Sequence, residues 1–169
     1  MTELRVFLNT WGNYNENGAD GGEWIALPCD DLEEKMDKLA AAMGDNDPEW
    51  FVNDYEWEGI DLFEVSEYSN IEDLNKQLEE FAYLNEYEQK TVAALLEAGC
   101  YSKLQDAIDS VDRCYFRADV TIEDLAYEEA EKFLHDVPDI VKRHFDYGSF
   151  ADELKNYYTE TSYGVICDW

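Results

Sequence analysis

Basic residues are scarce in this 169-residue chain, which has 12 Lys and Arg against 41 Asp and Glu and a formal charge of −29. A surface with so few cations repels the phosphates of nucleic acids. It also repels anionic lipid headgroups. Direct binding to nucleic acid or to a membrane is therefore excluded, and we expect a cationic partner, either a basic protein groove or multivalent metal ions.

Long apolar runs are also missing, since none approaches the roughly 20 residues that span a membrane. Residues 1–10 lack the basic and then apolar segments of a signal peptide. No pair of cysteines has CxxC spacing, so we expect free thiols rather than disulfides or zinc ligands. The four cysteines are Cys29, Cys100, Cys114 and Cys167. Together these features predict a cytoplasmic protein.

Catalytic and metal-binding signatures are absent as well. The two histidines, His135 and His144, belong to no HExxH motif, and the sequence has no GxSxG, Walker lysine loop or GxGxxG. Residues 13–18 imitate the start of a calcium loop, but Trp24 stands where the bidentate Glu is needed. Residues 45–50 fail similarly, because a Trp occupies the Gly position. We therefore predict no enzyme, no cofactor and no metal site.

The chain nevertheless has enough apolar residues to fold, since 46% are hydrophobic and 15% are aromatic. Disordered acidic segments lack this aromatic content. The acidity is also spread evenly, with net charges of −13 in residues 1–62, −9 in residues 63–112 and −7 in residues 113–169. This pattern predicts folded elements with solvated acidic faces rather than an acidic tail.

The magnitude of the charge favours a functional surface over simple solubility, for which about 2–8 charges suffice. Duplex DNA carries about two charges per 3.4 Å step, so 29 charges correspond to about 15 base pairs, or about 50 Å of duplex. A compact chain of this length has a radius of gyration near 15 Å, or a diameter of about 40 Å. The charge per unit length is therefore of the same order as that of DNA.

Hydrophobic periodicity predicts an α+β fold of three small subdomains in a row, comprising residues 1–62, 63–112 and 113–169. In the first, Leu4, Val6 and Leu8 alternate with other residues as in a strand. The predicted elements are, in order, a strand at 4–8, a turn-rich loop over 12–22, a strand at 23–27, a helix over 32–43 that ends at Gly44, and a strand at 50–57.

The middle subdomain is predicted to be helical, and the last to return to α+β. Capping boxes are expected at Ser69 with Glu72 and at Thr121 with Asp124. We further expect a helix over 87–98, one opened by Ser102, strands at 114–118 and 163–169, short helices at 139–145 and 149–158, and a helix from Thr121 whose Ile122, Leu125, Phe133 and Leu134 turn inward.

The candidate partner-binding residues are acids on the outward faces of these helices. Asp124, Glu128 and Glu131 recur at i, i+4 and i+7, so they form a ridge that advances about 6 Å and then about 4.5 Å along the axis. The full set is Glu33, Glu34, Asp37, Glu72, Asp73, Glu79, Glu80, Asp109, Asp112, Asp124, Glu128 and Glu131.

Several short motifs are spread along nearly the whole chain. They are Arg5-Val-Phe-Leu8, Tyr14-Asn15, Gly18, Gly22 and Trp24, followed by Trp50–Glu56, Glu67–Asn75, the stretch from Leu95 to Val111, Phe145–Tyr147 and Tyr163-Gly164. Together they resemble the ArdA antirestriction proteins of conjugative plasmids and transposons, whose antirestriction motif falls in the stretch from Leu95 to Val111. The chain departs from the family at Ala151-Asp-Glu-Leu154, where the usual sequence is Gly-Arg-Asp-Leu, so a cation is lost and an acid is added.

This resemblance implies an elongated three-part fold, a homodimer joined through the C-terminal part, and acids placed like DNA phosphates. It also implies that the partner is a type I restriction–modification enzyme, whose DNA-recognition and methyltransferase subunits bind the protein in place of DNA. Two alternatives stay open. One is an acidic, chaperone-like protein that binds basic DNA-associated proteins, and the other is an enzyme of a salt-adapted organism, which the missing catalytic motifs disfavour.

Overall fold

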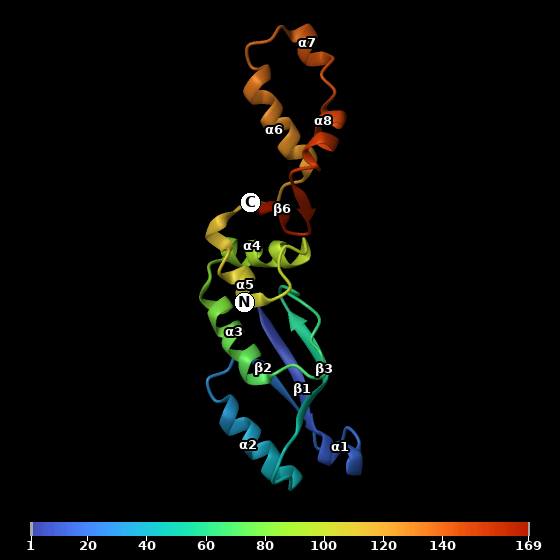
Figure 1. The fold of residues 1–169 in the computed structure, drawn as a ribbon, viewed down its shortest axis with the longest axis vertical. Helices are drawn as coiled ribbons and strands as arrows, with labels where there is room; N and C mark the ends of the chain where they lie inside the picture. The colour runs from blue at the N-terminus through green and yellow to red at the C-terminus, as the bar shows by residue number, and fades with distance from the viewer. Residues whose placement is uncertain (1, 169) are drawn as a thin grey trace. The chain divides into compact units, whose positions relative to one another are not determined.

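The computed structural model describes residues 2–168, and the chain forms two compact units, Met1–Asn85 and Glu86–Trp169. Each unit contains its own three-stranded antiparallel sheet together with helices (Figure 1). The predicted α+β class is therefore confirmed. The division into three subdomains and their elongated arrangement stay predictions.

The sheet of the first unit places β1 (Glu3–Thr10) between β2 (Glu23–Leu27) and β3 (Trp50–Glu58). The side chains of Leu4, Val6 and Leu8 are fully buried, as the alternation predicted. Their burial follows from strand geometry, because every second side chain points to the same face. The three strands expected in this part of the sequence are all present.

Two helices, α2 (Leu32–Met43) and α3 (Ile71–Tyr83), lie on the same side of this sheet in Figure 1. Each buries one apolar stripe, as its sequence spacing predicted. Gly44 ends α2 with a φ of 71°, a conformation that glycine adopts without steric cost. The Asn75 amide exchanges hydrogen bonds of 2.8 and 3.1 Å with the Cys29 backbone, which joins α3 to the segment before α2.

The predicted loop over residues 12–22 is wrong in its first half, because Trp11–Asn17 form the helix α1. The Thr10 hydroxyl accepts a hydrogen bond of 3.1 Å from the backbone amide of Asn13 and so caps the helix. Asn17 donates to Asn13 one turn earlier. Asparagines usually favour turns, but here their side chains form hydrogen bonds within a helix. Gly18 ends that helix with a φ of 67°.

The capping box expected at Ser69 and Glu72 is also wrong, because α3 begins one residue later. Asn70 immediately precedes the helix, and its side chain accepts a hydrogen bond of 3.0 Å from the Asp73 amide. The Ser69 hydroxyl instead accepts from the Ser66 amide in the preceding turn. Position relative to the first helical residue decided which side chain caps.

The sheet of the second unit has the order β4-β6-β5, with both pairs antiparallel. Its core joins the buried faces of α6 and α8 to Val165 of β6. The elements are α4 (Glu86–Glu97), α5 (Leu104–Ile108), the 3-10 turn η1 (Val111–Arg113), β4 (Cys114–Ala118), α6 (Ile122–Leu134), α7 (Asp139–Arg143), α8 (Tyr147–Leu154), β5 (Thr159–Thr161) and β6 (Gly164–Asp168).

The capping box at Thr121 and Asp124 is confirmed, with both of its reciprocal hydrogen bonds present. The helix expected from Ser102 instead follows Lys103, whose backbone is extended, and it ends before Val111. Phe133 is 53% exposed rather than buried, although its neighbour Leu134 lies in the core. The Phe133 ring instead contacts the rings of Phe145 and Phe150.

The end of the chain differs from its prediction in one further respect. Residues 149–158 were expected to form one helix, but α8 begins after Asp146, whose carboxylate caps it through the Ser149 amide at 2.9 Å. The helix ends at Leu154, which leaves residues 159–161 to form the edge strand β5. A three-residue strand is too short to leave a clear periodicity in the sequence.

Gly164, where β6 begins, generates a prediction about stability. It has a φ of 140°, and a Cβ placed there would lie 2.1 Å from the Arg117 carbonyl oxygen. We expect Gly164→Ala to lower the free energy of unfolding by about 2–4 kcal/mol, because the strand pair must move apart. Urea denaturation checks this value.

Gly148→Ala is the matched control. The nearest atom to a Cβ at Gly148 is an Asp146 carboxylate oxygen at 3.4 Å, and the backbone there has no positive φ. Its effect should stay within about 0.5 kcal/mol. Equal losses for the two variants would contradict the proposed steric cause.

Candidate acidic interaction surface

The outward acids of α2 lie opposite its buried stripe. Glu33, Glu34 and Asp37 are all exposed, because the helical period places them on the solvent side. The Lys38 ammonium forms an ion pair with Glu34 one turn earlier. This ion pair neutralises part of the α2 charge and leaves Glu33 and Asp37 as its open carboxylates among the three predicted residues.

The predicted acids of α3 divide into two kinds. Glu72 and Asp73 are exposed in the first turn, where carboxylates also complement the helix dipole. Glu79 is half-buried and accepts a hydrogen bond of 2.8 Å from the Asn75 amide. Glu80 is half-buried too. The later pair is therefore less accessible to a partner than the first pair.

In the second unit, Asp109 and Asp112 are exposed around the end of α5. Asp109 accepts a hydrogen bond of 3.2 Å from the Gln105 amide group, four residues earlier. The Arg113 guanidinium donates to the Asp109 carbonyl oxygen rather than to its carboxylate. Both carboxylates therefore remain at the surface.

The ridge predicted on α6 is present, and its three acids are exposed. They differ in their partners, however. Asp124 is held in the capping box, Glu128 forms an ion pair of 2.8 Å with Arg117 of β4, and Glu131 has no ion-pair partner in the described part of the chain. One of the three charges is thus largely neutralised inside the protein.

Acids on β3 were missed by the sequence reasoning, which concentrated on helices. Asp54, Glu56 and Glu58 are all exposed, and their spacing of two places them on one face of the strand. Glu56 forms an ion pair of 2.7 Å with Arg5, whose guanidinium lies 5.4 Å from the centre of the Trp24 ring. Their alternation in the sequence was the signal that could have found them.

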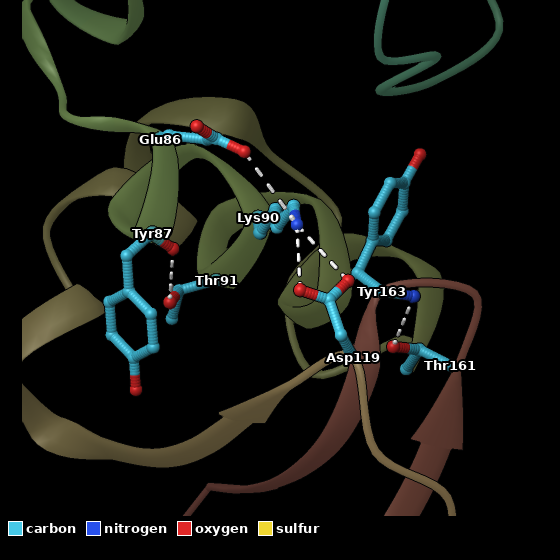
Figure 2. Close-up of polar contacts among 7 residues, drawn as sticks. All are labelled: Glu86, Tyr87, Lys90, Thr91, Asp119, Thr161 and Tyr163. Carbon is cyan, nitrogen blue, oxygen red and sulfur yellow. Dashed lines mark hydrogen bonds and ion pairs between the residues drawn. The ribbon is translucent and has the colours of Figure 1, made fainter.

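Lys90 of α4 lies among acids in the second unit (Figure 2). Its ammonium is 2.9 and 3.0 Å from the two carboxylate oxygens of Asp119 and 3.8 Å from Glu86. The hydrogen bond to Asp119 raises the pKa of Lys90, with the charge of Glu86 adding to the shift. Asp119 has a left-handed φ of 58°, and its amide donates to the Tyr163 carbonyl oxygen. The ion pair therefore holds the turn after β4 against α4.

Most of the few cations are already paired with acids. Seven of the 12 Lys and Arg form ion pairs with carboxylates among residues 2–168. The remaining carboxylates outnumber the free cations heavily, so the electrostatic potential outside each unit is strongly negative.

Among residues 2–168, no group of three or more His, Cys, Asp or Glu is arranged to hold a metal ion. No helix in that range is long and apolar enough to cross a membrane.

These observations define an acidic α+β protein whose helices bury apolar stripes and direct carboxylates toward solvent. In a comparison with protein families, residues 6–167 match the model described as antirestriction protein (ArdA). The match covers nearly the whole chain, so the protein belongs to the ArdA antirestriction family, and the resemblance noted in its motifs is confirmed. A comparison with curated proteins gives no match.

The capping box of α6 generates a prediction about pH. Hydrogen bonds from the Thr121 amide and hydroxyl hold the pKa of Asp124 below its ordinary value of 3.8. A carboxyl with a lowered pKa stabilises the fold above its unfolded-state pKa, and this contribution is lost as the pH falls through the folded-state pKa. We expect Asp124→Ala to lower Tm at about pH 7, and the difference from the parent to shrink below pH 3.8.

Thermal unfolding followed by circular dichroism at several pH values measures this difference. Glu131→Ala is the control, because Glu131 is exposed on the same helix and caps nothing. Its Tm should stay close to that of the parent at neutral pH. A Glu131→Ala loss as large as that of Asp124→Ala, with the same pH course, would contradict a capping role.

Proposed function

We propose that this protein inhibits type I restriction–modification enzymes as a mimic of duplex DNA. It would occupy the DNA-binding groove formed by their DNA-recognition and methyltransferase subunits. The observation that carries this proposal is the family membership of a chain that is acidic in both of its units. Residues 1–85 have 22 acids and 4 bases, or −18, and residues 86–169 have 19 acids and 8 bases, or −11.

The spacing of carboxylates on a helix supports mimicry of a phosphate row. Asp124 and Glu131 lie seven residues apart on α6, with Glu128 between them, so the row extends about 10.5 Å at 1.5 Å per residue. One DNA strand places a phosphate about every 3.4 Å along the axis, so it has about three or four charges over the same length. One helical row is therefore comparable to one strand, and Arg117 makes it somewhat weaker by pairing with Glu128.

The mechanism we propose is competition for a cationic groove. DNA gains affinity for such a groove by releasing its condensed counterions. A protein has fewer counterions to release, but its carboxylates are fixed on packed helices, so less conformational entropy is lost on binding. Because no base sequence has to be read, one inhibitor could act on enzymes of different specificity. The proposal needs no catalytic residue and no cofactor.

A homodimer is part of the proposal, joined through the second unit. Apolar side chains exposed there support it, since they include Ile140 at 67%, Val141 at 47% and Phe133 at 53% exposure. A second copy that covered them would remove apolar area from water. Two copies of a chain with such a high negative charge repel each other. A dimer therefore needs an attraction, which burial of these apolar side chains would supply.

We expect the protein to sediment as a dimer at micromolar concentration, and Ile140→Asp to shift it toward the monomer by burying a charge at the contact. Sedimentation equilibrium measures this shift. Tyr83→Asp is the control, because Tyr83 is 92% exposed in the first unit. A parent protein that stays monomeric under these conditions would sink the dimer proposal.

We expect the complex with a purified type I enzyme to weaken at least about tenfold between about 50 and 200 mM salt, because exposed charges are screened within about 8–10 Å. Saturating duplex DNA should prevent the complex. Fluorescence anisotropy with labelled inhibitor measures both effects. The exclusion by DNA also separates this function from that of a chaperone-like acidic protein, which would not compete with duplex for the enzyme.

Two variants sharpen the test. A triple change, Glu33→Gln, Glu34→Gln and Asp37→Asn, removes the acids of one helix and should weaken binding and flatten its salt dependence. Glu128→Gln alone should change affinity by less than about fivefold, because a single exposed carboxylate contributes about 1 kcal/mol or less. An affinity that is independent of salt, or a ternary complex with DNA, would rule out the mimic.

A further inference from the structure

A cavity of about 340 Å³ opens in the first unit beside α1 and β3. Its walls come from the start of α1, from the first half of β3 and from the segment that follows β3. The lining combines four aromatic residues, Trp11, Tyr14, Phe51 and Tyr55, with two acids, Asp54 and Glu67. This combination is unusual for a solvated acidic face, and neither the charge count nor the helical acids account for it.

Three of the four aromatic residues that line the cavity contact one another. Trp11 stacks on Phe51 with ring centres 4.1 Å apart and planes 14° from parallel. Tyr14 meets both rings edge-on, at 6.2 and 5.4 Å, and is still 39% exposed. Ring faces carry negative electrostatic potential, so they attract a cation that approaches them. The stacking also fixes the rings in place before any ligand arrives.

Two of the lining residues are acids, Asp54 and Glu67, and both are exposed. No Lys or Arg lines the cavity. Three of the four cations of residues 1–85 form ion pairs elsewhere, Arg5 with Glu56, Lys35 with Asp31 and Lys38 with Glu34. The cavity is therefore lined by acids and aromatic rings without a basic residue of its own.

The same unit shows how such a group would be held. The Arg5 guanidinium lies over the Trp24 ring at 5.4 Å and contacts the Glu56 carboxylate at 2.7 Å. One aromatic face and one carboxylate thus hold an internal arginine. The cavity offers both kinds of group without an internal cation. A guanidinium suits it better than an ammonium, because it is planar, stacks on rings and is less strongly hydrated.

We propose that this cavity binds an arginine side chain presented by a basic protein partner. The identity of that partner rests on the proposed function, since arginines line a groove that binds DNA phosphates. The chemistry of the cavity does not rest on it. The cavity adds a discrete anchor with a fixed position to an otherwise diffuse electrostatic attraction, so it would set where on the first unit the partner's groove lies.

The first experiment titrates the full chain with N-acetyl-arginine amide while NMR follows the indole N–H of Trp11. We expect a saturable shift, a weaker one with N-acetyl-lysine amide, and about five- to tenfold weaker arginine binding in Tyr14→Leu and in Asp54→Asn. Tyr83→Leu and Glu58→Gln are the matched controls, because both residues are exposed and lie outside the cavity. The amide spectrum of each variant verifies that it is folded.

The second experiment measures the affinity of Tyr14→Leu for the purified restriction enzyme, and we expect about tenfold weaker binding than for Tyr83→Leu. No saturable shift with the arginine probe, or equal affinity of the parent and Tyr14→Leu for the arginine probe, overturns the inference even if the parent inhibits the enzyme. Probe binding without any enzyme binding by the parent overturns the proposed function and leaves the arginine site standing. Probe binding with unchanged enzyme affinity in Tyr14→Leu overturns the assignment to this partner.

Discussion

The hydration of 41 carboxylates is the constraint on which the rest of this structure depends. An ionised carboxylate loses several kcal/mol of solvation when it is buried without compensation, so each helix can turn only a narrow apolar stripe inward. In α2 that stripe contains Leu32, Met36 and Leu39. The acids between them are left outside by the helical period. The core and the acidic surface are thus opposite faces of the same helices. A shift of the apolar positions along a helix would also move its acidic positions.

A small network of buried amides links this fold to the aromatic cavity. The Asn9 side chain is fully buried, accepts hydrogen bonds from the Thr10 backbone and the Asn13 side chain, and donates to the Gly18 carbonyl oxygen. Asn13 also donates to the Asp20 carbonyl oxygen at 2.7 Å. These bonds fix both ends of α1 against β1. The rings of Trp11 and Tyr14 are therefore carried by a helix that these polar contacts hold in place, together with the stacking of Trp11 on Phe51.

Local patterns in the sequence predicted the structure correctly where the alternation or spacing of residue types alone decides which side chains are buried. The alternation of Leu4, Val6 and Leu8 predicted a buried strand, and ten of the twelve candidate acids are exposed as expected. Their role in binding stays a prediction. Helix ends were predicted less well, since the caps at Asn70 and Asp146 were missed. Contacts between segments distant in sequence left no local signal. Glu128 gave no sign of Arg117, because that ion pair requires β4 beside α6, whereas Lys38 with Glu34 could be predicted from a spacing of four.

The carboxylates that cap helices do different work from those that only face solvent, and this has a consequence for how such a sequence can evolve. Asp124 and Asp146 each satisfy a particular backbone amide, so a change at either position alters the end of a helix. Glu33 or Glu131 contributes mainly its charge, which another position on the same face could supply. We expect divergence among functional descendants to move the outward acids freely while total charge is kept, and to spare the caps.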